Sequence, residues 1–175
     1  SRARNAMILT DLVTCSAGYS PMEWQKSLFP SEFQHKLEVC HDGIDTELWR
    51  PRGGDRVIAG ERIPAGTRIV TYVSRGLEAM RGFDVFVRLA KRIAAQRKDV
   101  IFVVVGETGV HYGNDERYLD GAKSFKDKVL AAEQPPLDRF RFLGRLAPDD
   151  LAQVMSHSDL HVYLTVPFVL SWSML

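Results

Sequence analysis

The sequence has little cysteine and almost no net charge. Its two cysteines, Cys15 and Cys40, lie far apart and belong neither to a Cys-x-x-Cys pair nor to a cluster with histidine. They indicate neither a disulfide scaffold nor a zinc site, and a reducing, cytoplasmic setting fits them best. The formal net charge is +1, with basic and acidic residues mixed along the chain. Because no field of one sign would gather nucleic acid, we expect no nucleic-acid partner, and any bound anion must be held by a local pocket.

Long apolar runs are also absent. The most apolar stretch, residues 160–175, is shorter than the roughly 20 residues that a membrane helix needs, and it contains His161 and Pro167. We interpret it as buried interior and predict no transmembrane segment. The chain stops at Leu175, inside this stretch and without a helix-ending signal, so we expect the fold to be truncated at its C-terminus.

Several enzyme motifs are missing as well. No Gly-x-Gly-x-x-Gly opens the first helix of the predicted sheet unit, which argues against a dehydrogenase. No Asp-x-Asp motif for a metal is present, and no Ser/His/Asp or Cys/His order suggests nucleophilic catalysis. We therefore expect neither a metal nor a cofactor.

From about residue 68 onward, short apolar runs alternate with amphipathic stretches. This alternation is typical of an α/β fold in which helices flank a Rossmann-like parallel sheet. The run at 100–105 carries no polar side chain, so we expect it near the centre of the sheet. The predicted strands are 69–73, 100–105, 140–143 and 160–164, and the predicted helices are 83–97, 114–132 and a third from Pro148.

The first fifty residues follow a different pattern. A helical stretch runs up to Val13, a second covers 21–29, and a short apolar piece surrounds Val39. We expect these residues not to form a βαβ unit. Residues 50–55 are rich in turn formers and read as a linker. We therefore predict that residues 1–52 are the end of one domain with its linker, and that 53–175 form a second, incomplete domain.

The loops that follow the predicted strands carry the candidate chemistry. In an open parallel sheet, ligands bind at the carboxyl ends of the strands. Arg75 follows the first strand and Arg81 precedes the next helix. A helix N-terminus and two forked guanidinium groups together suit a diphosphate. The alternative is that both arginines are solvated loop residues.

A second loop adds polar residues after Gly109. It contains His111, Tyr112 and Asp115. This loop either shapes a sugar pocket or is an ordinary solvated connection.

Short motifs in matching order resemble the group 1 glycosyltransferases. Tyr72-Val-Ser-Arg-Gly-Leu77 followed by Met80-Arg-Gly-Phe83 is similar to the family's "GRL...KGF" element. Three further segments agree with it in order and spacing from about Val39 to Tyr163. They are 39–51, similar to "V..NGVD...F.P", 103–107, similar to "..VG.G", and 139–163, similar to "V.FLG.V...L...Y..AD.FV.PS".

The resemblance implies one half of a two-domain GT-B glycosyltransferase. Such an enzyme would transfer a sugar, with retention of configuration, from a nucleotide-sugar donor to an acceptor that the sequence does not identify. Carried over by position, the donor diphosphate would be bound by Arg75, Gly76 and Arg81, the last standing where the family usually has lysine. The nucleotide would be met by Gly106, Glu107, Gly144, Arg145 and Leu146.

The family's pair of glutamates is where this sequence departs from the pattern. No glutamate occurs in residues 165–175, Phe168 stands at or near the place of the first, and the second would fall past Leu175. We assign Ser171 to the edge of the sugar pocket. The catalytic residues stay unidentified, and the chain by itself is expected to bind donor weakly and to be inactive.

Two other functions stay open. In the first, the chain is a non-catalytic Rossmann-like module in which Arg75 and Arg81 bind another anion or a protein partner. In the second, it belongs to a nucleotide-sugar epimerase of similar fold, which would need an acid/base set that we do not find in the sequence.

Overall fold

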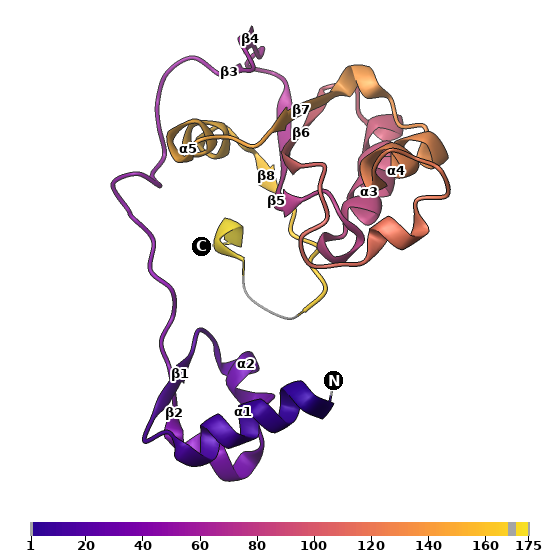
Figure 1. Ribbon diagram of the computed structural model, residues 1–175. Coiled ribbons are helices and arrows are strands. Elements are labelled where there is room, and N and C mark those ends of the chain that lie inside the picture. Colours follow the sequence, from indigo (N-terminus) through magenta and orange to yellow (C-terminus); the bar gives the residue numbers. More distant parts are fainter. Residues whose placement is uncertain (1, 168–170, 175) are drawn as a thin grey trace. The chain divides into compact units, whose positions relative to one another are not determined.

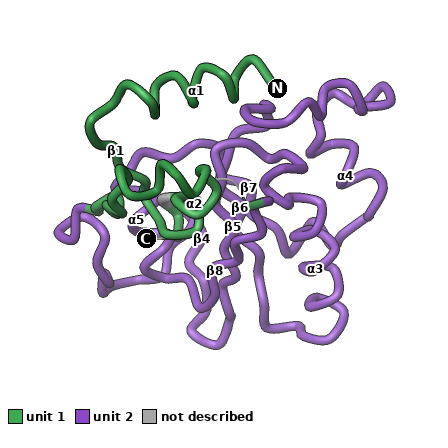
Figure 2. Tube along the Cα trace, turned by 90° about the horizontal axis from the view of Figure 1, so that it is seen from below, with its two compact units in different colours: residues 1–44, 167–175 green, residues 45–166 purple. Residues whose placement is uncertain are grey.

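The computed structural model describes residues 2–167 and 171–174 and divides the chain into two compact units. One unit contains Ser1–Ile44 and Pro167–Leu175, and the other contains Asp45–Val166. Figure 2 colours the first unit green and the second purple. The assignment of residues 1–52 and 53–175 to two domains stays a prediction.

The first unit is small and consists of short helices and two short strands. Its elements are α1 (Arg2–Thr14), β1 (Gly18–Ser20), α2 (Glu23–Ser27), the 3-10 helix η1 (Ser31–Lys36), β2 (Leu37–Val39) and the 3-10 turn η5 (Trp172–Met174). The Lys36 ammonium donates to the carbonyl oxygens of Leu12, Val13 and Cys15 at 2.9, 3.3 and 2.9 Å. This lysine therefore satisfies carbonyl groups that the end of α1 leaves without helical partners.

The first fifty residues do contain a small βαβ arrangement, so the expectation that they would not is wrong. β1 and β2 pair in parallel, with Gly18 opposite Leu37 and Ser20 opposite Val39, and α2 and η1 lie between them in sequence. The strand β1 is only three residues long and has the sequence Gly-Tyr-Ser. Such a segment carries no apolar run or alternation that would mark it as a strand.

The second unit contains the predicted parallel sheet. Its strand order is β7-β6-β5-β8, and all three neighbouring pairs are parallel. In Figure 1 the helix α5 lies on one side of this sheet and α3 and α4 lie on the other. The α/β architecture and the interior place of the second predicted strand are therefore confirmed. The bounds are β5 (Arg68–Gly76), β6 (Val100–Glu107), β7 (Phe140–Gly144), β8 (Leu160–His161), α3 (Phe83–Gln96), α4 (Phe125–Glu133) and α5 (Pro148–Ser156).

Alternate residues of β5 and β6 face two separate cores. On the side of α3, Tyr72 and Phe102 pack with Phe86, which is fully buried. On the opposite side, Ile69 and Val103 pack with α5. A strand covered on both faces must be apolar at every position, which is why residues 100–105 contain no polar side chain.

Two predicted elements are shorter in the structure. Of residues 114–132, only the 3-10 turn η3 (Asp115–Tyr118) and α4 are helical, because Asp120 and Gly121 have positive φ angles and interrupt the helix. The hydroxyl of Ser124 then accepts from the Asp127 N–H at 3.1 Å and starts α4. The predicted strand 160–164 reduces to β8, after which the Val162 N–H still donates to the Thr71 carbonyl at 2.9 Å.

A short hairpin precedes the sheet and was not predicted. It consists of β3 (Val57–Ile58) and β4 (Glu61–Arg62), which pair antiparallel. Both residues of its turn have positive φ angles, 52° at Ala59 and 79° at Gly60. These angles match the two-residue turns that suit the twist of a hairpin. Two more 3-10 turns complete the unit, η2 (Ala79–Arg81) and η4 (Leu137–Arg139).

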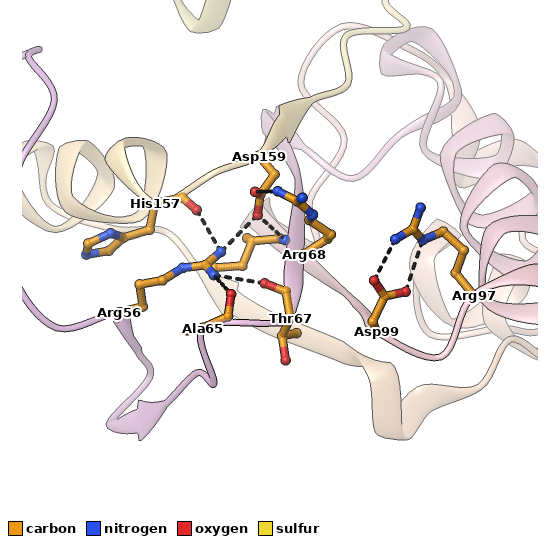
Figure 3. A network of polar contacts seen from close by, with 9 residues as sticks. Arg56, Ala65, Thr67, Arg68, Arg97, Asp99, His157 and Asp159 are labelled. Carbon is orange, nitrogen blue, oxygen red and sulfur yellow. Dashed lines mark hydrogen bonds and ion pairs between the residues drawn. The ribbon is translucent and has the colours of Figure 1, made fainter.

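A carboxylate holds the amino-terminal edge of the sheet together (Figure 3). Asp159, just before β8, accepts from the Arg56 and Arg68 guanidinium groups at 2.8 Å each. It also accepts from the Ile69 backbone N–H at 2.8 Å. One side chain thus links the hairpin region, the start of β5 and the start of β8. Among the residues that the structure describes, no helix is both long and apolar enough to cross a membrane.

Candidate functional site

The ends of β5, β6 and β7 bring several of the predicted residues to one edge. In the register of the sheet, Gly76 lies opposite Glu107, and Val105 lies opposite Gly144. The strands are parallel, so this edge is formed by their carboxyl ends. It is the edge at which open α/β sheets bind ligands.

Arg75 is an exposed cation at this edge. The register between β5 and β6 shifts between Val73 and Gly76, so the chain is irregular where Arg75 lies. The side chain is exposed. An irregularity at a strand end re-aims a side chain away from the regular pleat. A phosphate contact of Arg75 stays a prediction, beside the alternative of a solvated side chain.

Arg81 is in a different setting, because it is buried. It lies in η2, immediately before Gly82 and α3, and is 6% exposed. Its guanidinium lies over the Tyr112 ring, 4.5 Å from the ring centroid, and its Nη1 donates to the Thr165 hydroxyl at 3.4 Å. The alternative of a solvated loop arginine is wrong for this residue.

Tyr72 supports Arg81 from the core. Its hydroxyl donates to the Arg81 carbonyl oxygen at 3.0 Å. Burial raises the pKa of this phenol, so it stays protonated and remains a donor.

Glycine is required at two strand ends for close backbone packing. A Cβ on Gly76 would lie 2.5 Å from the Gly109 carbonyl oxygen and 2.8 Å from Cδ2 of His111. A Cβ on Gly106 would lie 2.4 Å from the Ser74 carbonyl oxygen. At Gly76 the space is filled by the loop after β6, and at Gly106 it is filled by the neighbouring strand β5, so glycine is needed at both positions for the close approach of the backbones.

Gly144 differs from these two. It has a φ angle of +66°, and a Cβ built on it would meet no atom within 4 Å. Glycine here serves the left-handed backbone, and the space beside it is open. The next residue, Arg145, is highly exposed, and Leu146 packs against the core on the α5 side.

Glu78 is the main residue of this region that the sequence analysis missed. Its side chain is fully buried, and its Oε2 accepts from the N–H groups of His111, Tyr112 and Gly113 at 3.0, 3.0 and 3.1 Å. In return, Oδ2 of Asp115 accepts from the Ala79 N–H at 2.7 Å. We call this reciprocal pair of contacts the Glu78–Asp115 clasp.

The clasp changes the interpretation of the loop after Gly109. Asp115 is 8% exposed, and the N–H groups of His111, Tyr112 and Gly113 all point to one carboxylate. The alternative of a solvated connection is therefore wrong for Asp115, whereas Tyr112 is 43% exposed and His111 is also exposed. A role of the loop in a sugar pocket stays a prediction. No sequence signal marked Glu78, because its partners lie 33 to 35 residues further along the chain.

Glu107 joins the loops after β6 and β7. Its Oε2 lies 3.4 Å from Nε2 of His111, and its Oε1 lies 3.5 Å from Nη1 of Arg145. Two residues predicted separately to meet the nucleotide, Glu107 and Arg145, are thus neighbours.

Ser171 belongs to the first compact unit. Its hydroxyl lies 3.2 Å from that of Ser173. Its assignment to a sugar pocket stays a prediction. Phe168, at or near the place of the first family glutamate, lies outside the described residues.

Comparisons with known proteins agree with this architecture. The family model of the glycosyl transferases group 1 matches residues 55–166, and that of the glycosyl transferase family 4 group matches residues 1–49. A search of the curated proteins finds no match. The crystal structure of TarM is similar with a TM-score of 0.51 and 11% identity, over 91% of this chain and 27% of that chain.

The likeness to TarM concerns the fold alone, and our chain spans about a quarter of that protein's length. The group 1 match is more extensive, because it covers well over half of the chain and includes the whole sheet of the second unit. This chain therefore belongs to the group 1 glycosyl transferase family.

Proposed function

We propose that residues 45–166 bind the diphosphate of a nucleotide-sugar donor at the carboxyl edge of β5, β6 and β7. The supporting observation is the sheet register, which brings Gly76, Glu107 and Gly144 to one edge in a chain of the group 1 family. The protein would be a glycosyltransferase that passes the sugar to an acceptor.

The two arginines have different roles in this proposal. Arg75 is exposed and is assigned the direct contact with phosphate oxygens, for which a forked guanidinium is well shaped. Arg81 is buried, so solvent screens its charge less than it would screen a surface charge. In this proposal Arg81 lies behind the phosphates, where its fixed positive charge attracts them, and the edge of its guanidinium contacts a phosphate oxygen.

The nucleoside is assigned to the ends of β6 and β7. Gly106, Glu107, Gly144, Arg145 and Leu146 lie there, and the open space beside Gly144 allows a ligand to approach the backbone.

Charge stabilisation is the chemical contribution that this edge can make. When the bond to the sugar breaks, negative charge grows on the departing nucleoside diphosphate. Positioned cations and N–H groups stabilise that charge more than they stabilise the bound donor, and this difference lowers the barrier. In this proposal the step proceeds with retention of configuration and without a metal. Retention predicts that the product has the donor's anomeric configuration, which the coupling constant of the anomeric proton reports.

Calorimetric titration of the chain with UDP, GDP, ADP and CDP tests the donor site. We expect at least one to bind and Arg75→Ala to weaken it about tenfold, the effect of losing one hydrogen bond to a charged group. Arg92→Ala is the matched control, because Arg92 is an exposed arginine of α3. Binding by none of the four to a folded chain would contradict the proposal.

Two further parts of the proposal concern the activity of the chain and its location. The chain alone is proposed to bind donor without transferring sugar, which a transfer assay with a radiolabelled donor would check. A cytoplasmic location is proposed because Cys15 and Cys40 are both free and Cys40 is exposed, as suits a reducing compartment.

A further inference from the structure

We propose that Glu78 is a positioning residue of the donor site, which acts by holding the loop of residues 109–115 against the end of β5. The inference rests on the donor site proposed above. It concerns a residue that contacts no phosphate itself and determines where its neighbours lie.

The contacts of Glu78 are unusually concentrated. One oxygen, Oε2, accepts hydrogen bonds from all three N–H groups of residues 111–113, and the side chain is fully buried. Bonds from N–H groups to a carboxylate are stronger than bonds between neutral groups. They offset much of the cost of burying the charge. Asp115 closes the other end of the clasp on the Ala79 N–H.

The location of the Glu78 carboxylate means that its charge by itself would oppose the binding of a diphosphate. Its Oε1 lies 3.3 Å from the place of a Cβ on Gly76, so the negative charge is next to the strand end assigned to the diphosphate. Within the described part of the chain, no group donates a hydrogen bond to this oxygen. A negative charge here repels a phosphate. A benefit to donor binding must therefore come from the geometry that Glu78 imposes.

Through this loop, Glu78 influences the surroundings of two site residues, Arg81 and Glu107. The N–H of Tyr112 is fixed by Glu78, and the Tyr112 ring covers the Arg81 guanidinium. The N–H of His111 is fixed in the same way, and the His111 imidazole lies beside Glu107. Releasing the loop would free the aromatic cover of Arg81 and the neighbour of Glu107 together.

Two substitutions separate position from charge. Glu78→Gln removes the charge and keeps a side-chain oxygen that can accept the three N–H groups. Glu78→Ala removes both. We expect Glu78→Gln to bind the nucleoside diphosphate as tightly as the unsubstituted chain or more tightly, and Glu78→Ala to bind it about tenfold more weakly. The affinities would be measured by calorimetry with UDP, GDP, ADP and CDP, well below the unfolding temperature of each variant.

A control with a similar structural role tests whether lost stability alone explains the result. Asp159 is also a carboxylate that accepts a backbone N–H and guanidinium groups, but it lies at the opposite edge of the sheet. Asp159→Asn should lower stability and leave the affinity unchanged. Hydrogen exchange provides a second readout: the amides of residues 111–113 should exchange faster in Glu78→Ala and remain protected in Glu78→Gln.

The measured affinities of the variants either support the inference or overturn it. Equal affinity of Glu78→Ala and the unsubstituted chain overturns it, as does tighter binding by both variants or a loss that Glu78→Gln does not rescue. If Glu78→Ala does not fold, Asp115→Ala replaces it, and unchanged affinity there also overturns the inference. If the unsubstituted chain binds none of the four nucleotides, the donor site fails and the inference fails with it. Binding that is insensitive to the clasp overturns the inference alone.

Discussion

Replacing Asp159 by asparagine should destabilise the second unit at neutral pH, by an amount that follows from its three contacts. The carboxylate is 26% exposed and accepts from Arg56, Arg68 and the Ile69 N–H at 2.8 Å each. Asparagine keeps the shape and one acceptor oxygen but loses the charge. The exposed pair with Arg68 contributes little because water screens it, whereas the less exposed Arg56 contributes more. The expected cost is about 2 kcal/mol.

The pH dependence of this difference has a definite sign. Burial alone would raise the pKa of Asp159, but the Ile69 N–H and the Arg68 and Arg56 guanidinium groups outweigh it and lower the pKa. A carboxyl group with a lowered pKa in the folded state stabilises the fold above its unfolded pKa of about 3.9. That stabilisation is lost as the pH falls through the lower, folded value.

Urea unfolding of the two proteins, followed by circular dichroism between pH 7 and pH 2, measures the difference directly. The unsubstituted chain should be more stable by about 2 kcal/mol at pH 7, and the difference should shrink below about pH 4. A difference that is absent at pH 7, or one that persists unchanged at the lowest pH, would refute the reasoning.

Three other substitutions test separate parts of the structure. Gly76→Ala places a Cβ 2.5 Å from the Gly109 carbonyl oxygen, so it should displace the loop after β6 and weaken nucleoside diphosphate binding in calorimetry. Phe86→Ala empties a fully buried site between α3 and the sheet and should cost about 3–5 kcal/mol in urea unfolding. Gln134→Gly, at the end of α4 with a φ angle of 47°, should stabilise by about 1 kcal/mol, because glycine adopts that backbone without strain. Unchanged nucleotide affinity of Gly76→Ala would contradict the first prediction, and a loss of stability under about 1 kcal/mol in Phe86→Ala would contradict the second. A lower stability of Gln134→Gly would contradict the third.

The sheet of the second unit was predictable because its signals are local. The strand at 100–105 is apolar throughout, and the helix that begins at Phe83 repeats its apolar residues at helical spacing. Both patterns arise from neighbours in the sequence. The interruption before Phe125 also has a local signal, which the prediction of one helix over 114–132 did not use. Asp120-Gly121 is a turn-forming dipeptide, and aspartate and glycine adopt the left-handed backbone more readily than most residues.

The candidate site was predictable only in part. Arg75, Gly76 and Glu107 follow from the rule that ligands bind at strand ends, together with the family resemblance. Glu78 did not follow, since a glutamate in a polar loop is usually exposed and its three N–H partners come from the backbone of a distant loop. Backbone groups leave no mark in the sequence, so a carboxylate that binds them cannot be recognised before the fold is known.

The central claim, a nucleoside diphosphate at the carboxyl edge of the sheet, is tested most directly by mapping the ligand onto the backbone. A 15N-labelled chain titrated with UDP, GDP, ADP or CDP reports each amide separately by NMR. The claim predicts that the shifted amides cluster at residues 75–76, 106–107 and 144–146. Shifts that cluster around Arg56 and Asp159 at the opposite edge, or no shifts with any of the four nucleotides, would contradict it.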